Sequence, residues 1–262
     1  MAEQQIRFDD GAAYEKMMGV WSRLVGEEFL DWLALPTGLR CVDIGCGNGA
    51  FTELLIERCE PSAVAGVDPS EGQLAFARTR PGTRIAKFQQ AGAEELPFAD
   101  KSFDAAFMAL VIFFVPNPTK GLAEMKRVTK AGGTIAAYAW DMLGGGFPLE
   151  PLQAELRAMG QKYMLPPSAD VSRLPALRTL WEEGGLEAVE TRAFTVRRTF
   201  ANFDEVWSTY MSSPSTGATV AKMAPAEVET LKARVRERLP ADAAGRITYA
   251  ARANAVKSRV PK

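Results

Sequence analysis

Histidine is absent from this chain of 262 residues. Its absence excludes Ser-His-Asp and Cys-His nucleophilic catalysis, metal sites built on imidazole, and acid–base chemistry at a histidine ring. Cysteine is also scarce, because the sequence has three, Cys41, Cys46 and Cys59, and no two of them form a CxxC pair. This spacing argues against a disulfide framework and a thiolate zinc site, and it fits a reducing compartment. We therefore expect no metal centre.

Long hydrophobic runs and an excess of one charge are also missing. The longest apolar run, residues 105–115, stops at Pro116 after 11 residues, so it is too short to cross a bilayer and fits a buried strand. The 31 basic and 32 acidic residues leave a net charge of −1, which attracts neither nucleic acid nor an anionic membrane. The polar start MAEQQIRFDDG differs from a secretory signal. We predict a cytoplasmic protein with a small-molecule partner, and the oligomeric state stays open.

Strand-like and helix-like segments alternate in the first half of the chain. Short apolar runs bounded by turn residues predict buried strands at 39–44, 63–68, 84–90, 103–110 and 134–140. Helical periodicity lies between them, and one of these helices is expected to end at Gly132-Gly133. Strand–helix alternation at this spacing indicates right-handed βαβ units in a doubly wound sheet.

The pattern changes after Trp140. A breaker-rich turn is followed by helical segments at 151–185 that prolines interrupt, among them Pro175, and by helices at 202–212 and 225–238. Two further strands are predicted at 186–200 and 245–256. We predict one α/β domain over 1–262, with a doubly wound, mostly parallel seven-stranded sheet and an inserted helical cap. Within it, 1–35 forms N-terminal helices, 36–141 the ligand-binding half, and 142–262 the cap and the last two strands.

The segment CVDIGCGNGAFT (41–52) places a glycine loop directly after the first strand. Ligands of open α/β sheets bind outside the carboxyl ends of the strands, and glycine lets a backbone approach a ligand closely. No lysine follows the glycines, which argues against a nucleoside triphosphate site. The spacing is GxGxG rather than the GxGxxG of dinucleotide sites, and Asp43 just ahead of it would repel a pyrophosphate. That carboxylate favours a ligand with a cationic or amine group.

Asp68 ends the second strand. A carboxylate at this position can accept hydrogen bonds from both hydroxyls of a ribose. Taken alone, the segment DPSEGQ is explained equally well by a helix cap. The glycine loop upstream favours the ribose interpretation.

Four segments follow one another over residues 42–135: VDIGCGNGAFT, GVDPS, AEELPFADKSFDAAF and LAEMKRVTKAGGTI. In this order they resemble the successive motifs of class I S-adenosylmethionine (SAM)-dependent methyltransferases, in particular small-molecule enzymes of the ubiquinone/menaquinone-biosynthesis type. The upstream YEKMMGVWSRL (14–24) is similar to an N-terminal helix of such enzymes. The resemblance implies a Rossmann-like methyltransferase fold, with SAM as cofactor and S-adenosylhomocysteine as product.

The resemblance also implies roles for individual residues. The methionyl part would be held by the loop residues Asp43, Gly45, Gly47 and Gly49, while Cys46 within the loop is expected to pack rather than react. Asp68 would take the ribose hydroxyls. The adenine would be contacted by Pro69, Gln73, Ala93 and Glu94, and Leu110 would lie near the methyl donor.

Three positions depart from the family pattern. Gly92 stands where an acid often binds the adenine amino group, and Gln73 stands where a methionine often packs on the ring. Phe113-Phe114 replaces a pair of histidines that often follows the fourth strand. Loss of the two adenine contacts predicts a cofactor affinity weaker by about 1–2 kcal/mol if nothing compensates.

Methyl transfer from a sulfonium is an in-line displacement that depends mainly on positioning and exclusion of water, which suits a chain without histidine. If a base is needed, the candidate is Asp141, which follows the fifth strand. The alternative is a turn residue ahead of MLGGG.

The substrate wall is expected from aromatic and methionine side chains, which favour a small apolar or flat acceptor. The candidates are Tyr14, Met17, Met18, Trp21, Phe114, Trp140, Phe147, Tyr163, Trp207 and Met211. Each of these side chains, taken singly, is more often a core residue than a pocket residue.

Two other functions fit parts of the sequence. One is an NAD(P)-dependent oxidoreductase on a Rossmann sheet, although the glycine spacing and the lack of a Tyr-x-x-x-Lys pair argue against it. The other is a non-catalytic, SAM-binding regulatory protein, which the departures at Gly92 and Gln73 leave open.

Overall fold

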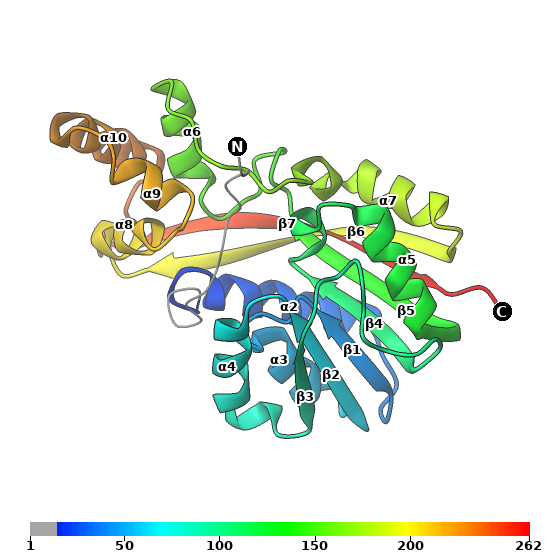
Figure 1. Cartoon of the computed structure of the whole chain (residues 1–262). Coiled ribbons are helices and arrows are strands. Elements are labelled where there is room, and N and C mark those ends of the chain that lie inside the picture. The colour runs from blue at the N-terminus through cyan, green and yellow to red at the C-terminus, as the bar shows by residue number, and fades with distance from the viewer. Residues whose placement is uncertain (1–14) are drawn as a thin grey trace.

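The structure, a computed structural model, describes residues 15–262 (Figure 1). Seven strands are present, with the bounds β1 (Arg40–Ile44), β2 (Ala63–Asp68), β3 (Ala86–Gln90), β4 (Phe103–Ala109), β5 (Thr129–Trp140), β6 (Glu187–Phe200) and β7 (Ile247–Arg259). All seven join one sheet in the order β3-β2-β1-β4-β5-β7-β6. Strand order therefore reverses between β1 and β4, and ligands of doubly wound sheets bind at such a switch point.

Strand direction follows the prediction. Every pair from β3 to β5 is parallel, whereas β7 runs antiparallel to both β5 and β6. Parallel strands covered by helices are buried on both faces, and for this reason β4 is almost continuously apolar and four of the five residues of β1 are buried, Asp43 among them. Each of the seven predicted strand segments overlaps one observed strand. The predicted α/β, doubly wound, mostly parallel sheet is confirmed.

Helices cover both faces of this sheet. Their bounds are η1 (Glu15–Gly19), α2 (Val20–Leu33), α3 (Ala50–Cys59), α4 (Glu71–Thr79), η2 (Pro81–Thr83), η3 (Ile112–Phe114), α5 (Pro118–Val128), α6 (Glu150–Ala158), η4 (Ala169–Ser172), α7 (Leu174–Glu183), α8 (Phe203–Met211), α9 (Thr216–Val220) and α10 (Pro225–Arg238). α2 and α3 pack together on one face, while α5 and α7 pack on the other (Figure 1). Side-chain caps start several of them: the Asn117 Oδ1 accepts from Lys120 N at 3.0 Å at α5, where Pro118 follows.

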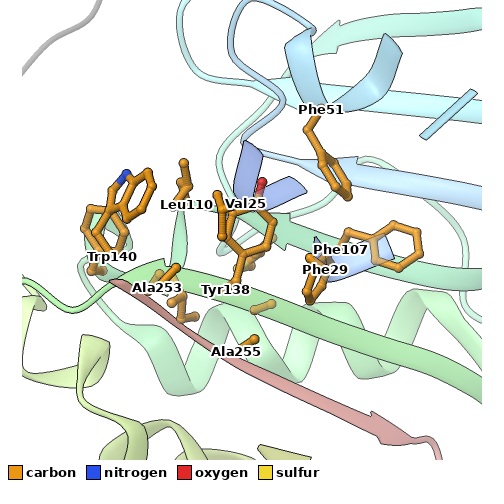
Figure 2. Close-up of a cluster of buried hydrophobic side chains, with 14 of the residues drawn as sticks. Val25, Phe29, Phe51, Phe107, Leu110, Tyr138, Trp140, Ala253 and Ala255 are labelled. Carbon is orange, nitrogen blue, oxygen red and sulfur yellow. The ribbon is translucent and has the colours of Figure 1, made fainter. Parts of the chain in front are cut away.

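The core between α2, α3 and the sheet is aromatic. The ring of Phe29 lies 4.6 Å from that of Tyr138 and 6.1 Å from that of Phe51, which in turn lies 6.0 Å from Phe107. These tilted and edge-on contacts bury large apolar area in the arrangement that aromatic rings prefer. Leu110 and Trp140 lie at one end of the same cluster (Figure 2).

The cap consists of α6, α8, α9 and α10, which lie together at the end of the sheet where β6 ends and β7 begins (Figure 1). α8, α9 and α10 are inserted between β6 and β7, and α6 lies between β5 and β6. Glu155 on α6 pairs with Arg238 and Arg234 on α10, so the two insertions are joined.

The structure corrects two local predictions. The helix expected to end at Gly132-Gly133 ends at Val128, and both glycines lie inside β5, because the strand bulges there: its register against β4 shifts and Gly132 takes a φ of +73°. Pro175 does not interrupt a helix but stands in the first turn of α7, where its missing N–H costs nothing. The division of the chain into domains stays a prediction. None of the helices described for residues 15–262 is long and apolar enough to cross a membrane.

Candidate cofactor and substrate site

The glycine loop leaves β1 in a conformation that needs glycine. Gly45 has a φ of +73°, and a Cβ added there would lie 2.5 Å from the side chain of Val111, in the loop after β4. Gly47 has a φ of +51°, but an added Cβ would meet nothing closer than Gln73 Oε1 at 3.9 Å. The loop therefore packs tightly against the protein at Gly45 and presents open backbone at Gly47, where a ligand can approach.

Asp68 is held against this loop. The N–H groups of Gly45 and Cys46 donate to Val67 O at 2.7 and 2.9 Å, which ties the loop to the end of β2. Gly47 N then donates to Asp68 Oδ2, and Ser70 N to Asp68 Oδ1, each at 2.9 Å. Burial raises the pKa of the Asp68 carboxyl, although both amide donors favour its ionised form. The carboxylate is thus oriented by backbone groups and keeps lone pairs for a further donor.

Asp43 lies completely buried beneath the loop. Its Oδ2 accepts from Thr52 Oγ1 at 2.6 Å, while its Oδ1 has no hydrogen-bond partner among residues 15–262. Burial raises the pKa of this carboxyl to about 7, against the opposing effect of the Thr52 hydrogen bond and with a further increase from the nearby charge of Asp68. An acceptor without a partner at this place fits the cationic ammonium of a methionyl group.

The predicted adenine contacts gather at the same edge of the sheet. Ala91 N donates to Asp68 O at 3.2 Å, which brings the segment after β3 beside the end of β2. Pro69 is exposed on that edge, Gln73 is buried in the first turn of α4, and Glu94 Oε1 accepts from Asn117 N at 2.7 Å. Ala93 lies between these groups in sequence and is half-buried.

Cys46, inside the loop, is a buried thiol. Burial and the nearby carboxylates raise its pKa well above the usual range, so it is kept as a neutral thiol. This environment fits the packing role expected from the sequence. The set around the glycine loop therefore fits SAM: an acceptor for the ammonium, open backbone at the loop, and an oriented carboxylate for the ribose.

A cavity with about 520 Å³ of empty space, including the solvent at its mouth, opens next to the loop. It is lined by Met17, Met18, Leu110, Phe113, Phe114, Trp140, Met142, Phe147, Gln153, Met164, Pro166, Ser213, Pro214 and Ser215. Apolar and sulfur-containing side chains dominate, and among residues 15–262 no charged side chain lines it. Such a wall suits an uncharged, apolar or flat molecule.

Two connections place this cavity beside the cofactor loop. Leu110, at the end of β4, has the left-handed φ of +62° and lines the cavity, while its neighbour Val111 touches Gly45. On the other side, η1 provides Met17 and Met18 to the cavity. The same helix contacts the cofactor loop, because Glu15 Oε2 accepts from Asn48 Nδ2 at 2.9 Å. The cavity and the cofactor loop therefore share a border.

The structure brings some of the predicted wall residues together and not others. Those that line the cavity are Met17, Met18, Phe114, Trp140 and Phe147. Trp21 instead is fully buried, with its ring 5.2 Å from that of Tyr249. Tyr163 accepts a hydrogen bond from Arg157, and Trp207 stacks on Phe203 at 6.2 Å. Met211 is also absent from the wall, and Tyr14 lies outside the described residues.

Asp141 also lies away from the cavity wall, although its neighbours Trp140 and Met142 line it. Its Oδ2 accepts from Arg252 Nη2 at 2.6 Å and Nε at 3.0 Å, and its Oδ1 accepts from Gly144 N at 3.0 Å. Every oxygen of this carboxylate is thus engaged in holding the 141–146 turn to β7.

The sequence analysis missed over half of the wall: Phe113, Met142, Gln153, Met164, Pro166, Ser213, Pro214 and Ser215. Phe113 and Met142 adjoin residues that were predicted, so proximity in sequence could have found them. The remaining six come from the cap, where no spacing in the sequence indicates which side chains meet.

Comparison with known proteins agrees with this geometry. Residues 42–137 match the family described as "Methyltransferase domain". The chain is 32% identical over 132 residues to 2-methyl-6-phytyl-1,4-hydroquinone methyltransferase 2 of Oryza sativa subsp. japonica, a match that covers 50% of this chain and 36% of that protein. It is 26% identical over 196 residues to demethylmenaquinone methyltransferase of Staphylococcus aureus, covering 67% and 78%.

The fold recurs in a solved structure, phosphoethanolamine N-methyltransferase 2 of Haemonchus contortus in complex with SAM, at a TM-score of 0.58 and 18% identity over 96% of this chain and 56% of that one. The chain therefore shares its fold with that solved methyltransferase, and the glycine loop lies within the residues that match the family. Residues 42–137 are therefore similar to methyltransferase domains, and the predicted class and cofactor are confirmed. Because the chain spans little more than a third of the rice protein, that match defines a domain and not a substrate. In the part of the chain described, no group of three or more Cys, Asp or Glu side chains is placed to hold a metal ion.

Proposed function

We propose that this protein transfers a methyl group from SAM to a small, neutral, apolar or aromatic molecule bound in the cavity beside Leu110. The observation that carries the proposal is the shared border between the two sites: Val111 touches the cofactor loop at Gly45, while the adjacent Leu110 lines the cavity. A methyl donor on the loop and an acceptor in the cavity would then meet at the end of β4.

The chain's own residues would act by binding, orientation and exclusion of water. When bound, SAM supplies an electrophilic methyl group on a sulfonium. Asp43 would receive the ammonium, the open backbone at Gly47 would face the methionyl part, and Asp68 would accept from the ribose hydroxyls. Pro69, Gln73, Ala93 and Glu94 would surround the adenine.

The acceptor is inferred from the wall. An ionised substrate would have to leave water for a cavity in which no charged side chain among residues 15–262 pairs with it, which is strongly unfavourable. The quinol-type molecules named for the rice and staphylococcal proteins are neutral and flat and fit this wall, whereas a phosphoethanolamine does not. An acidic phenol, an activated carbon or an amine needs no dedicated base from the chain, in agreement with the absence of histidine.

Titration of the protein with S-adenosylhomocysteine by calorimetry tests the cofactor half without knowledge of the acceptor. We expect micromolar binding, and its absence at millimolar ligand would overturn the proposal. Transfer of a labelled methyl group from SAM to a panel of phenols, quinols and amines tests the other half, with phosphoethanolamine as the charged control. Transfer to the control alone would contradict the neutral-acceptor assignment.

We further propose a cytoplasmic location and no nucleic-acid partner. Three buried free thiols, Cys41, Cys46 and Cys59, support a reducing compartment. The near balance of charge supports a small-molecule partner over a nucleic acid. Retention of the protein in the soluble cytosolic fraction of its host cell is the measurement that checks the location.

A further inference from the structure

Gln153 differs from the other side chains of the cavity wall. It projects from α6, is 3% exposed, and lines the cavity. Its Oε1 is buried without a hydrogen-bond partner among residues 15–262. Buried amides in folded proteins are nearly always paired, so an unpaired one beside a cavity is a position for a ligand.

The other polar side chains that the cap contributes to this wall are already engaged. Ser213 Oγ accepts from Thr216 N at 3.2 Å, and Ser215 Oγ donates to Met164 O at 2.7 Å. These two hydroxyls hold the 213–216 turn and the 164 segment in place. Gln153 Oε1 is therefore the side-chain acceptor in this part of the wall that has no partner among residues 15–262.

The position of this carboxamide is set by its helix. Gln153 N donates to Leu149 O at 3.0 Å within the first turn of α6. On either side, Leu152 and Leu156 are fully buried, and Glu155 pairs with Arg238 of α10. Because α6 is fixed by the core and by this ion pair, Gln153 cannot leave the wall for solvent without moving the helix.

We propose that Gln153 recognises the polar end of the methyl acceptor, a neutral hydroxyl that donates a hydrogen bond to Oε1. The carboxamide carries no charge and offers both an acceptor and a donor, which matches a hydroxyl that donates and accepts. The apolar wall would hold the rest of the molecule. This inference rests on the proposed function, in that the cavity is taken as the acceptor site, and it narrows the substrate class to phenols and quinols among neutral aromatic molecules.

Two probes of similar shape test the proposal: 2-naphthol and 2-methylnaphthalene, in which a methyl group replaces the hydroxyl. Their affinities for the protein saturated with S-adenosylhomocysteine are measured by calorimetry for the wild type, for Gln153→Met, and for Gln161→Met as a control outside the wall. Comparison of the ratio of the two affinities between the wild type and each variant cancels the difference in hydrophobicity between the probes. We expect this ratio to fall at least about tenfold in Gln153→Met, from the loss of one hydrogen bond, and to stay within about twofold in the control.

An unchanged ratio in Gln153→Met would overturn the proposal and leave the carboxamide a position for bound water. The proposal would also be overturned if the wild type bound neither of the two probes. S-adenosylhomocysteine affinity, measured first on each variant, reports that the fold is intact. If the wild type fails to bind S-adenosylhomocysteine, the probes are titrated without it. A ratio that then still falls in Gln153→Met would mean that the proposed function fails while the recognition of a hydroxyl by Gln153 stands.

Discussion

The cofactor half and the cavity half of this site are built in different ways. The cofactor half comes from three consecutive loops between Asp43 and Glu94, and it works through backbone conformation, amide donors and two carboxylates. The cavity wall draws on six separate segments between Met17 and Ser215, and it works through apolar side chains. One half is local in the chain and polar, whereas the other is assembled over long range and is almost free of charge.

This difference explains where each half is vulnerable. A loop whose glycines take left-handed conformations and which covers a buried carboxylate is sensitive to single atoms, because a Cβ or a proton changes it directly. A wall of side chains from many elements depends on the packing of the cap and tolerates changes that keep volume. Substitutions in the cofactor half should therefore have larger and more specific effects.

The largest effect is expected at Asp43, whose pKa is raised to about 7 by burial and by the nearby Asp68. Between the ordinary carboxyl pKa and this value, the folded protein holds a proton that the unfolded chain releases. The contribution of Asp43 to the free energy of unfolding is therefore fully present below about pH 4. This contribution, on the order of 4 kcal/mol, is lost as the pH rises to about 7. Asp43→Asn, neutral throughout, should gain over the wild type by this amount between pH 4 and pH 8.

Denaturant titrations of the ligand-free protein across that range measure the effect. The control is Asp104→Asn: partial burial raises the pKa of Asp104, but hydrogen bonds from Lys130 and from Arg40 N outweigh it and lower the pKa overall. Its contribution is lost only as the pH falls below about 4. If the free energies of unfolding of the wild type and of Asp43→Asn change in parallel from pH 4 to pH 8, the pKa of Asp43 is not raised by burial.

The second effect concerns the loop backbone. Gly45→Ala adds a Cβ at a φ of +73°, 2.5 Å from Val111, and should lower the free energy of unfolding by about 3 kcal/mol through strain and overlap. Gly132→Ala provides a matched control, because Gly132 has the same φ of +73° and no atom within 4 Å of an added Cβ. It should cost about 1 kcal/mol, the strain alone. Equal losses in the two variants would show that contact with the β4 loop does not matter.

The third effect is on binding. Asp68→Ala should weaken the affinity for S-adenosylhomocysteine tenfold or more, since it removes two ribose hydrogen bonds of about 1 kcal/mol each and frees the amides of Gly47 and Ser70. Glu71→Ala, which alters only a surface pair with Arg78 on the same helix, α4, should leave the affinity unchanged. Calorimetric titration measures both, and an unaltered dissociation constant for Asp68→Ala would take this residue out of the site.

The contrast also explains what could be predicted from the sequence. The sheet, and the positions of the glycine loop and Asp68 at its edge, were predictable because each depends on residues close in the chain: apolar runs predict buried strands, and parallel strands bring their carboxyl ends to one edge. The β5 bulge was not predictable, because the pair Gly132-Gly133 indicates the end of a helix until the pairing of this segment with β4 and β7 is known. The cavity wall in the cap was not predictable for the same reason. Tyr163 and Trp207 were expected to line the cavity but pack outside its wall, whereas Gln153, which was not expected there, lines it.

The smallest effect on activity is expected at Asp141, which follows β5 between two residues of the cavity wall, Trp140 and Met142. Its carboxylate is bound by Arg252, 111 residues away in the chain, and by Gly144 N, so the pair holds a turn together. Asp141→Asn and Arg252→Met should each lower the free energy of unfolding by about 1–2 kcal/mol, and the double variant by little more than either alone, since the same contact is lost.

Methyl transfer to an acceptor found by the panel then separates this structural role from the general base that the position after β5 suggested. A structural pair predicts that both single variants keep kcat within about twofold and the same pH profile. A base predicts that Asp141→Asn loses about 100-fold or more while Arg252→Met does not. Removal of Arg252 breaks the pair but leaves the carboxylate, so a large loss of kcat confined to Asp141→Asn would make Asp141 a catalytic residue. The cavity half would then contribute chemistry as well as shape.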